Sequence, residues 1–599
     1  MKIVCLVKQV PHPSAIDFDE ETKQLKRDGV PLLLNPFDAR AMAQAVRLRD
    51  ETGGELVAMT MGPPQAEEAL RQCLALGADR CIHLSDRVFA VADTIGTSRT
   101  LAMAIEREGA DVVVCGRKAI DAETAQVPPE VAAFLGRPHV TGVSELSASD
   151  GRFRFTRETD EGSETYEVDP PVVMSVGVPP ETTEPPDPLA DAGDRIAVWT
   201  AGDLVDDVQE NDKRFGQTGS PTRVLAVRDV RPKRGADRVE TPELAAEQIA
   251  ALLDALEPAD TSWDKPERLG DEPGASYDAW TMVELRAGKP TRLSLEVLAK
   301  GRELAGKLGG RNAGLLLGAG VGDAVEEIAS RGAEVVYVAD DERLADYHPE
   351  VWAEALRQIL ERYRPHALAI PASARGRDYG PRAAGELELG MTADCVNLGI
   401  DRAGRLIQTK PAYGGAFVSV IMGATTPQLA TVRSRMFEPL EPRHGARAEV
   451  HAIELDALPN GRLRLIQRRD DSAAYELEEA DVVIAVGAGV GGPAAVQEID
   501  TYAVRIGAAV GGDREVCDAG WVARNREIGL YGRALAPRLY IAVGVNGDFE
   551  HLVGPMKAGV VAAIDADQRA PMLAAADIAL VGDWRELLPT LVDALSARL

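Results

Sequence analysis

The chain has 599 residues, 45% of them hydrophobic and 27% charged, and its formal net charge at pH 7 is −29. A chain of this length is too long for one core, so we expect three or four domains. The negative charge argues against a nucleic-acid partner, because binding to phosphates needs a basic surface. The longest apolar runs are too short to span a membrane, and residues 1–10 lack the features of a signal peptide. We therefore expect a cytoplasmic protein with no direct membrane span.

The cysteines give no indication of a metal site or a disulfide framework. Six cysteines are scattered along the chain, without a CxxC pair and without clustered histidines. Zinc sites, iron–sulfur clusters and disulfide frameworks have characteristic close spacings that are missing here. We expect no metal and interpret the cysteines as small core residues. They are Cys5, Cys73, Cys81, Cys115, Cys395 and Cys517.

The N-terminal part alternates between short apolar runs and longer amphipathic stretches. This alternation predicts a parallel sheet covered by helices. The expected strands are 2–10, 55–62, 81–85 and 111–116, and the expected helices are 38–54, 64–80 and 97–110.

The segment 116–136, GRKAIDAETAQVPPEVAAFLG, is a candidate ligand-binding loop. It leaves the expected strand at a glycine, turns through polar side chains that include Asp121, Thr124 and Gln126, and enters an alanine-rich helix. Such a turn presents backbone N–H groups at the positive end of the helix dipole, where phosphate is commonly held. The alternative is an ordinary strand-to-helix connection, because α/β proteins bind ligands at few of their turns.

The same pattern returns in the second half of the chain. Residues 180–276 have the proline-rich and polar composition of connecting arms. After about residue 277, segments 295–310, 329–340, 359–371 and 374–390 resemble 38–54, 75–86, 104–116 and 116–136 in the same order. We infer two copies of one α/β domain, packed face to face as a pseudo-symmetric pair. The expected parts are 1–200, a connecting arm and linker 201–276, a second copy 277–455, and a third α/β domain 470–599.

The third domain contains a glycine pattern that is typical of dinucleotide binding. Gly487, Gly489 and Gly492 form GxGxxG after the apolar run DVVIAV, and Asp513 follows about twenty residues later. The alternative is a glycine-rich turn that serves packing only. A catalytic group that would make this an NAD-dependent oxidoreductase is not found, and no nucleophile elbow, P-loop or zinc-protease helix supports hydrolysis.

Two polar loops bracket the later strand RLYIAVGV and suit the rim of a cofactor site. Gly529, Tyr531, Gly532 and Arg533 precede this strand, and Asn546, Gly547, Glu550 and His551 follow it. Taken alone, His551 has the alternative interpretation of an ordinary core or surface histidine.

Together these segments resemble an electron transfer flavoprotein whose beta subunit (about 1–255) and alpha subunit (about 277–599) are fused. The resemblance covers nearly the whole chain. It rests on KIVCLVKQVP, NPFDARAMAQAVRL (35–48), TADC (392–395), QTKPAYGG (408–415), QLATVR (428–433), DAGWV (518–522), LYIAVGVNGDFEH and ALVGD (579–583).

The resemblance implies a fold and a role. The fold is α/β: two pseudo-symmetric Rossmann-like parallel-sheet domains and a C-terminal Rossmann-like FAD-binding-type domain that swings. The role is a carrier that acts with partner oxidoreductases rather than as a self-sufficient enzyme. It would accept electrons from a flavin-dependent dehydrogenase and pass them to a quinone reductase or an iron–sulfur protein. The alternative is a nucleotide-binding scaffold subunit with a degenerate C-terminal flavin site.

In the N-terminal half, the resemblance implies a nucleotide pocket. Segments 89–101 and 119–131 resemble the branch of the family in which a second FAD replaces AMP and which includes electron-bifurcating members. FAD is therefore expected in this half, with AMP as the alternative. The implied residues are Val7, Gln9, Asn35, Pro36, Phe37, Asp38, Asp93, Thr94, Thr97, Ser98, Asp121, Thr124, Ala125, Gln126 and Val127.

In the C-terminal domain, the resemblance implies FAD contacts at Gly487, Gly489, Asp513, Arg514, Gly529, Tyr531, Gly532, Asn546, Gly547, Glu550, His551, Asp565 and Asp583. The sequence departs from the family at several of these positions. Ala488 stands where the family's GGRG loop has an arginine over the flavin, and Glu527 to Gly532 replaces QVGQTG. These changes remove a cation and add carboxylates, so we expect FAD to bind this domain weakly, in an altered way or not at all.

Two further departures lie in the N-terminal half. Pro128 replaces a glycine of the phosphate loop and removes a backbone donor. The arm that docks the dehydrogenase is usually basic, and here it is the acidic PPETTEPPDPLADAGD (179–194), so we expect a dedicated partner.

Overall fold

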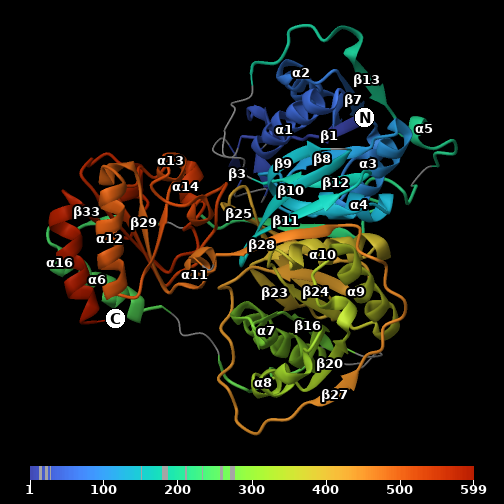
Figure 1. Ribbon diagram of the computed structural model, residues 1–599. Coiled ribbons are helices and arrows are strands. Elements are labelled where there is room, and N and C mark those ends of the chain that lie inside the picture. The colour runs from blue at the N-terminus through green and yellow to red at the C-terminus, as the bar shows by residue number, and fades with distance from the viewer. Residues whose placement is uncertain are drawn as a thin grey trace.

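The computed structural model describes residues 1–12, 16–19, 24–26, 29–149, 151–177, 186–209, 212–231, 234–256, 261–269, 277–471 and 473–598. Three α/β bodies meet at a central junction (Figure 1). We call them the N-terminal half, the second half and the C-terminal domain.

The N-terminal half is built on a ten-stranded sheet whose central strands are parallel. Apolar side chains fill both of its faces, with α1 and α2 on one and α3 and α4 on the other. The expected helices and the strands expected at 55–62, 81–85 and 111–116 are confirmed, whereas the strand expected at 2–10 ends at Leu6, and Gln9–Pro11 pairs in a separate ribbon. In spatial order the strands are β13 (Ile196–Trp199), β7 (Arg80–Leu84), β6 (Glu55–Met61), β1 (Lys2–Leu6), β8 (Val112–Gly116), β12 (Val172–Val176), β9 (His139–Ser149), β10 (Arg152–Thr159), β11 (Gly162–Val168) and β28 (Arg464–Asp470). The helices are α1 (Pro36–Thr52), α2 (Glu67–Leu76), α3 (Thr94–Glu108) and α4 (Val127–Leu135).

The second half repeats this topology, as the sequence repeat predicts. Its sheet order is β27 (Glu449–Ala452), β20 (Val335–Asp340), β19 (Asn312–Gly318), β16 (Ala279–Val283), β21 (Ala367–Pro371), β26 (Gln428–Val432) and β22 (Met391–Cys395). Strand for strand, this matches the order from β13 to β9 in the first copy. The helices are α7 (Arg292–Leu308), α8 (Val325–Ser330), α9 (Pro349–Tyr363) and α10 (Gly376–Leu387).

The C-terminal domain has a third parallel sheet. Its order is β15 (Asp237–Arg238), β33 (Ile578–Val581), β32 (Val560–Asp565), β31 (Leu539–Val543), β29 (Val482–Val486) and β30 (Ala509–Gly512). Its helices are α11 (Ala473–Glu479), α12 (Pro493–Arg505), α13 (Arg514–Asp518), α14 (Phe549–Leu552), α15 (Pro571–Ala574) and α16 (Trp584–Ser596). Among the described helices, none combines the length and the apolar character that crossing a bilayer requires.

The segment 201–276 is more than the connecting arm and linker that we expected. It carries α5 (Ala201–Leu204), β14 (Thr222–Asp229), β15 and α6 (Pro242–Asp254). Strand β14 extends a sheet with β25 (Phe417–Gly423), β24 (Leu406–Ala412) and β23 (Asn397–Ile400). Strand β15 pairs with β33, and α6 packs into the core of the C-terminal domain through Ala245, Ile249 and Leu253. The polar composition of this segment did not indicate these elements, which complete other domains.

Three short two-stranded ribbons lie elsewhere in the described parts of the chain. They are formed by β2 (Gln9–Pro11) with β5 (Leu32–Leu34), β3 (Asp17–Asp19) with β4 (Gln24–Lys26), and β17 (Leu285–Arg286) with β18 (Lys289–Pro290).

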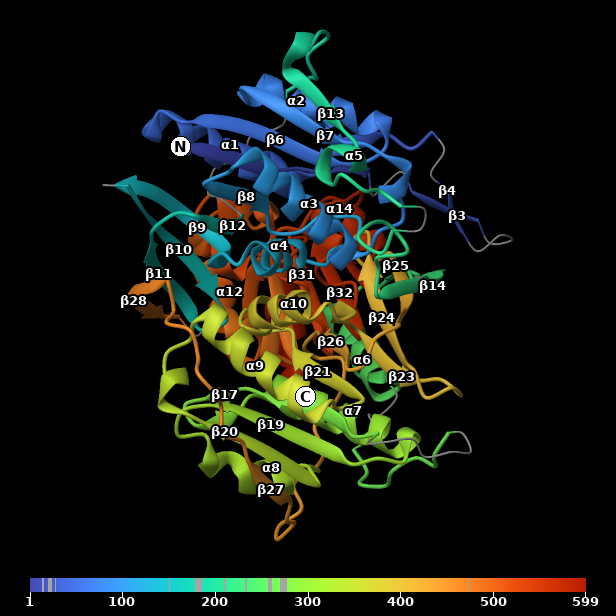
Figure 2. The same ribbon diagram turned by 90° about the vertical axis from the view of Figure 1, so that its right-hand side faces the viewer.

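The two halves meet through the corresponding helices α4 and α10, which lie side by side between the sheets (Figure 2). Glycine allows this close approach: a Cβ on Gly385 would lie 3.0 Å from the Cβ of Ala133 and 3.3 Å from the Cα of Glu130.

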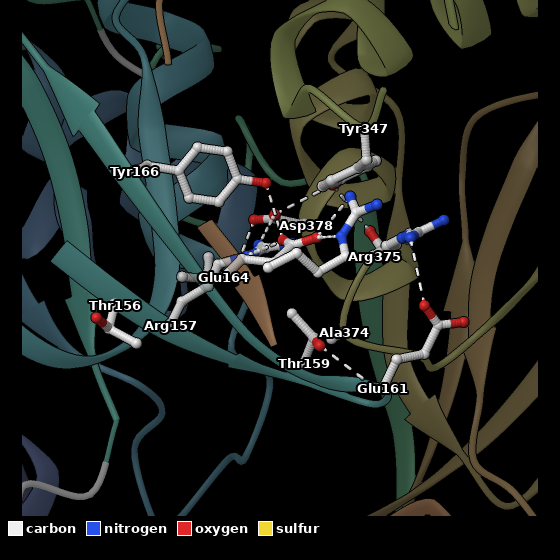
Figure 3. A network of polar contacts seen from close by, with 12 residues as sticks. Thr156, Arg157, Thr159, Glu161, Glu164, Tyr166, Tyr347, Ala374, Arg375 and Asp378 are labelled. Atoms are coloured by element: carbon white, nitrogen blue, oxygen red, sulfur yellow. Dashed lines mark hydrogen bonds and ion pairs between the residues drawn. The ribbon is translucent and has the colours of Figure 1, made fainter. Parts of the chain in front are cut away.

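A buried polar network reinforces this interface (Figure 3). Asp378 of α10 is fully buried and accepts hydrogen bonds from His139 Nε2 (2.9 Å), Thr141 Oγ1 (2.9 Å), Arg157 Nη1 (2.6 Å) and Tyr347 Oη (3.1 Å). Burial alone would raise the pKa of Asp378, but His139 and Arg157 hold it well below its usual range. The carboxylate is therefore charged, and it joins β9 and β10 of the N-terminal half to α10 of the second half.

Replacing Asp378 by Asn should destabilise the chain by about 3–5 kcal/mol, because Arg157 keeps its charge inside the interface without its main partner. The change can be measured by chemical denaturation followed through tryptophan fluorescence, since Trp352 packs on the rings of Tyr347 and Tyr379. The control is Asp169→Asn, which removes an ion pair to Arg152 with side chains 71% and 56% exposed. The control should cost less than about 1 kcal/mol. Equal effects of the two variants would contradict a structural role for the buried carboxylate.

Candidate functional site

The glycine turn after β29 has one packed side and one open side. A Cβ on Gly487 would lie 2.3 Å from the Gly544 carbonyl oxygen, and one on Gly489 would lie 2.9 Å from Gly544 Cα. These two glycines therefore let the turn contact the loop after β31, which is the packing role considered above. Gly491 (φ +93°) and Gly492 (φ +144°) adopt positive φ values and meet no atom within 4 Å on the Cβ side. The turn thus offers accessible backbone directly before α12, as a phosphate cradle requires.

Asp513, directly after β30, lies beside this turn, where a Cβ on Gly487 would be 2.7 Å from its Oδ2, and His551 belongs to α14, the short helix that follows β31. Asp513 accepts a hydrogen bond from Val516 N (3.1 Å), and burial raises its pKa to about 6, with further raising by Glu515 and Asp548. His551 is buried, with Nε2 2.8 Å from Tyr540 Oη, and its Nδ1 forms no full hydrogen bond to the described residues. Burial lowers the pKa of His551 to about 4, although Asp548 opposes the shift. The imidazole is therefore neutral at pH 7.

Tyr531 stands at the centre of the contact between the C-terminal domain and the N-terminal half. Its ring centroid is 4.1 Å from the guanidinium of Arg40 and 4.9 Å from that of Arg514. Its hydroxyl donates to Glu550 (3.1 Å), which also pairs with Arg514 (3.2 Å). Phe37 of α1 lies 5.5 Å away, ring to ring. Two cations, one from each body, therefore flank a single phenol ring.

Apolar contacts surround this ring and hold the two bodies together. The buried cluster consists of Val10, Phe37 and Ile120 from the N-terminal half and Leu530, Tyr531 and Val553 from the C-terminal domain. The rim loop 527–532 of the C-terminal domain is thus docked on the first turn of α1.

Comparison with known proteins identifies the chain. The profile of the electron transfer flavoprotein domain matches twice, at residues 22–204 and 279–458, and the profile of the electron transfer flavoprotein FAD-binding domain matches residues 476–556. The chain belongs to the electron transfer flavoprotein family.

Relatives of both family subunits match different parts of the chain. An electron transfer flavoprotein subunit alpha from Thermoanaerobacterium thermosaccharolyticum is 34% identical over 324 residues, covering 53% of this chain and 97% of the relative. The subunit beta of the same organism is 39% identical over 241 residues, covering 40% of this chain and 91% of the relative. Protein FixB of Bradyrhizobium diazoefficiens is 35% identical over 329 residues, 53% of this chain and 89% of the relative. One chain thus holds alpha-like and beta-like parts of the electron transfer flavoprotein family.

In the C-terminal domain, most of the residues expected to contact flavin share one edge of the sheet. A Cβ on Gly529 would lie 2.7 Å from the Glu550 carbonyl oxygen, and one on Gly532 would lie 2.1 Å from the Glu527 carbonyl oxygen. Gly547 and the Asn546 carbonyl contact Met572. Asp565, at the end of β32, accepts from Asp567 N (2.8 Å), and Asp583 accepts from Arg585 N (2.9 Å) at the start of α16.

In the N-terminal half, Asn35 and Asp38 lie at the start of α1, and their side chains hydrogen-bond to the backbone that follows β1 and β8. Asp38 accepts from Lys8 N (2.8 Å) and Gly116 N (3.2 Å), and burial raises its pKa to about 7. Asn35 donates to the Lys118 carbonyl (2.9 Å) and accepts from Ile120 N (3.2 Å). The other expected residues of this region also have partners within the chain. Val7 N donates a hydrogen bond to the Met59 carbonyl, and Gln9 Nε2 donates one to Glu68 (3.4 Å). Pro36 begins α1, and Asp121 forms an ion pair with Lys8 (2.7 Å).

The loop and helix starts expected to hold phosphate are arranged around a carboxyl group. Glu130 accepts from Thr94 Oγ1 (3.0 Å), Ser98 Oγ (2.9 Å) and Gln126 Nε2 (3.2 Å). Pro128 and Pro129 leave only the Val127 N–H among the first three backbone positions of α4. Asp93 caps α3 by accepting from Gly96 N (3.0 Å) and also accepts from Thr222 N (2.8 Å). Thr97, Thr124 and Ala125 are half-buried near these groups in the chain, and Ala125 has a φ of +54°.

Arg40 and Glu130 belong to the two candidate sites and were not predicted from the sequence. Arg40 is three positions after Phe37, so it shares the helix face that contacts the C-terminal domain. This spacing was the available signal for Arg40. For metals, no group of three or more ligating side chains occurs within the described part of the chain.

The buried position of His551 gives a testable titration behaviour. In a sample with ¹³C-labelled histidine, we expect the ring signal of His551, assigned by its absence in His551→Gln, to remain that of neutral imidazole from pH 7 down to about pH 5, because burial disfavours the charged form. Titration of His551 near pH 6.5 would show that its ring is solvated.

Proposed function

We propose that the chain is an FAD-dependent electron carrier or electron-transfer subunit, with FAD in the C-terminal domain. The observation that carries this proposal is the match of residues 476–556 to the family's FAD-binding domain, over the segment that forms the open glycine turn. The bound flavin would supply the one- or two-electron chemistry. We also propose the cytoplasm as its location.

The residues of the C-terminal domain fit a flavin nucleotide at its phosphate end and are altered at its ring end. Gly491, Gly492 and the start of α12 leave backbone open to a diphosphate. His551 offers Nδ1, a buried polar atom without a full hydrogen bond. Arg40 and Arg514 would place positive charge near the rim loop, where Ala488 lacks the family's cation. Arg40 can do this only while the C-terminal domain is docked, so the swinging motion implied by the family would alter the charge at the rim.

For the N-terminal half, we propose a second, weaker nucleotide, FAD rather than AMP. The similarity to the branch with two FAD molecules supports FAD. The two prolines at α4 and the use of Thr94, Ser98 and Gln126 by Glu130 argue for weak retention. A colourless protein with no retained flavin would favour the scaffold alternative.

We expect fewer than two FAD per chain, and about one, when flavin released by denaturation is compared with protein concentration. Gly491→Val should weaken FAD retention about tenfold, equivalent to 1.4 kcal/mol, because its side chain would enter the open side of the turn. Gly507→Val is the matched control: Gly507 also has a positive φ (+63°) and open surroundings, but it follows the far end of α12. Two tightly held FAD per chain, or equal losses in both variants, would contradict this assignment.

The expected donor is a flavin-dependent dehydrogenase, and the expected acceptor is a quinone reductase or an iron–sulfur protein. The acidic arm includes residues 179–185, which lie outside the described residues, and Asp187, Asp191 and Asp194, which lie within them. We expect poor reduction by acyl-CoA dehydrogenases, because a docking arm of reversed charge slows encounter with their usual surface. Stopped-flow reduction of the bound flavin measures this rate, and a rate typical of the family would contradict the prediction.

A further inference from the structure

A cavity of about 220 Å³ lies where the three bodies meet. The N-terminal half contributes the residues that follow β8, including Arg117 and Lys118. The second half contributes Asp394 of β22, Arg433 directly after β26, and Arg377 in the first turn of α10. Carboxyl ends of parallel strands, where α/β proteins bind ligands, thus converge on this cavity from both pseudo-symmetric halves.

One end of the cavity holds more cations than carboxylates. Asp394 is shared by Arg377 Nε (2.9 Å) and Arg433 Nη2 (3.3 Å). Glu123 pairs with Lys118 (3.3 Å) and accepts from Gly414 N (2.6 Å). Arg117 lies among these groups, so four cations face two carboxylates. This arrangement leaves a net charge of about +2 at one end of a partly open cavity, where the like charges repel one another unless an anion compensates them.

Arg117 is the least compensated of these groups. Among the described residues, none gives its guanidinium a hydrogen bond or an ion pair. Burial lowers the pKa of Arg117, and Arg377 lowers it further. A buried guanidinium has five donors, and their loss of water is normally repaid by acceptors.

The rest of the cavity lining carries seven carboxyl groups and four arginines, and burial raises the pKa of Glu284, Glu479 and Glu527, which disfavours their charged forms. Burial raises the pKa of Asp160, which accepts from Ala374 N (2.6 Å), and Glu478 pairs with Arg533. Glu158 is exposed to solvent. On the opposite side, buried Lys410 donates to the Ala122 carbonyl and adds positive charge near Glu123 and Asp394. The excess of positive charge therefore remains at the end formed by Arg117, Arg377 and Arg433.

We propose that this cavity binds a phosphate dianion between Arg117, Arg377 and Arg433, either as the free ion or as a phosphate monoester. A phosphate group carries close to two negative charges at pH 7 and accepts paired hydrogen bonds from guanidinium groups. Its charge matches the excess at this end of the cavity, whereas a single carboxylate would neutralise half of it. The three arginines lie apart from the glycine turn before α12 and from the start of α4, and the rim loop 527–532 lines another part of the same cavity through Glu527, Tyr531 and Gly532.

The test uses the full-length protein with FAD in excess, so that flavin sites are filled. Calorimetric titrations at constant ionic strength use inorganic phosphate, ribose 5-phosphate and, as the uncharged control, ribose. We expect both phosphates to bind and ribose not to bind. Tighter binding of ribose 5-phosphate would identify a monoester as the preferred source, and equal or weaker binding would identify the free ion.

Arg117→Gln should weaken phosphate binding about tenfold to a hundredfold, as expected when one charge-assisted hydrogen-bonding group is lost. Arg117→Lys should retain part of the affinity. The matched control is Arg402→Gln, which removes an exposed arginine from a turn in the second half and should bind phosphate like the wild type. Because Arg117 forms no hydrogen bond or ion pair to the described residues and lies near the like charge of Arg377, the unfolding temperature without phosphate should not fall in Arg117→Gln. Absence of phosphate binding to the wild type, or equal affinity in the wild type and Arg117→Gln, would overturn the proposal. Neither result depends on flavin content, so it leaves the proposed electron-carrier function to its own test.

Discussion

The buried carboxylate of Asp378 is the constraint on which the junction depends. It lies in the second half, yet its donors His139, Thr141 and Arg157 belong to the N-terminal half. Such a cluster contributes little net stability, because desolvation offsets most of the attraction, but misplacing any member leaves a buried charge unpaired. We infer that it fixes the register of α10 against β9 and β10. The same register brings the carboxyl ends of β8, β22 and β26 to one cavity.

The C-terminal domain attaches to this frame in a different way. Its contact with α1 is mainly apolar, through Leu530, Tyr531 and Val553, with Arg40 and Arg514 on the Tyr531 ring. Contacts of this kind require less precise geometry than a buried ion network, so a docked domain can separate and return. In the family, the corresponding loop hydrogen-bonds the flavin edge, and here the phenol of Tyr531 connects that loop to the N-terminal half. Flavin bound as proposed above would therefore be linked to the docking of the domain through one side chain.

Much of the fold could be predicted from the sequence, because each copy repeats the same order of apolar runs and amphipathic helices. The two repeated sheets have the same strand order, and the part of the chain with the glycine pattern forms a third α/β domain, as expected. The structured elements of 201–276 could not be predicted, since β14, β15 and α6 gain their stability from distant partners. The candidate site shows the same limit. Local motifs located the loops, but only the packed structure shows that Thr94, Ser98 and Gln126 converge on Glu130 and that Arg40 reaches Tyr531.

The distribution of charge gives the two pseudo-symmetric helix starts different roles. At α4, two prolines remove backbone donors and Glu130 takes up the neighbouring hydroxyl and amide groups, so this end is satisfied from within. At α10, Asp160 accepts from Ala374 N just before the helix, while Arg377 in its first turn faces the cavity beside Arg117 and Arg433. Equivalent strand ends of the two copies lie on both sides of the junction, and Arg117, Arg377 and Arg433 line the shared cavity. An anion bound there would contact both halves at once and stabilise the interface that Asp378 aligns, because it binds only when the two halves are assembled.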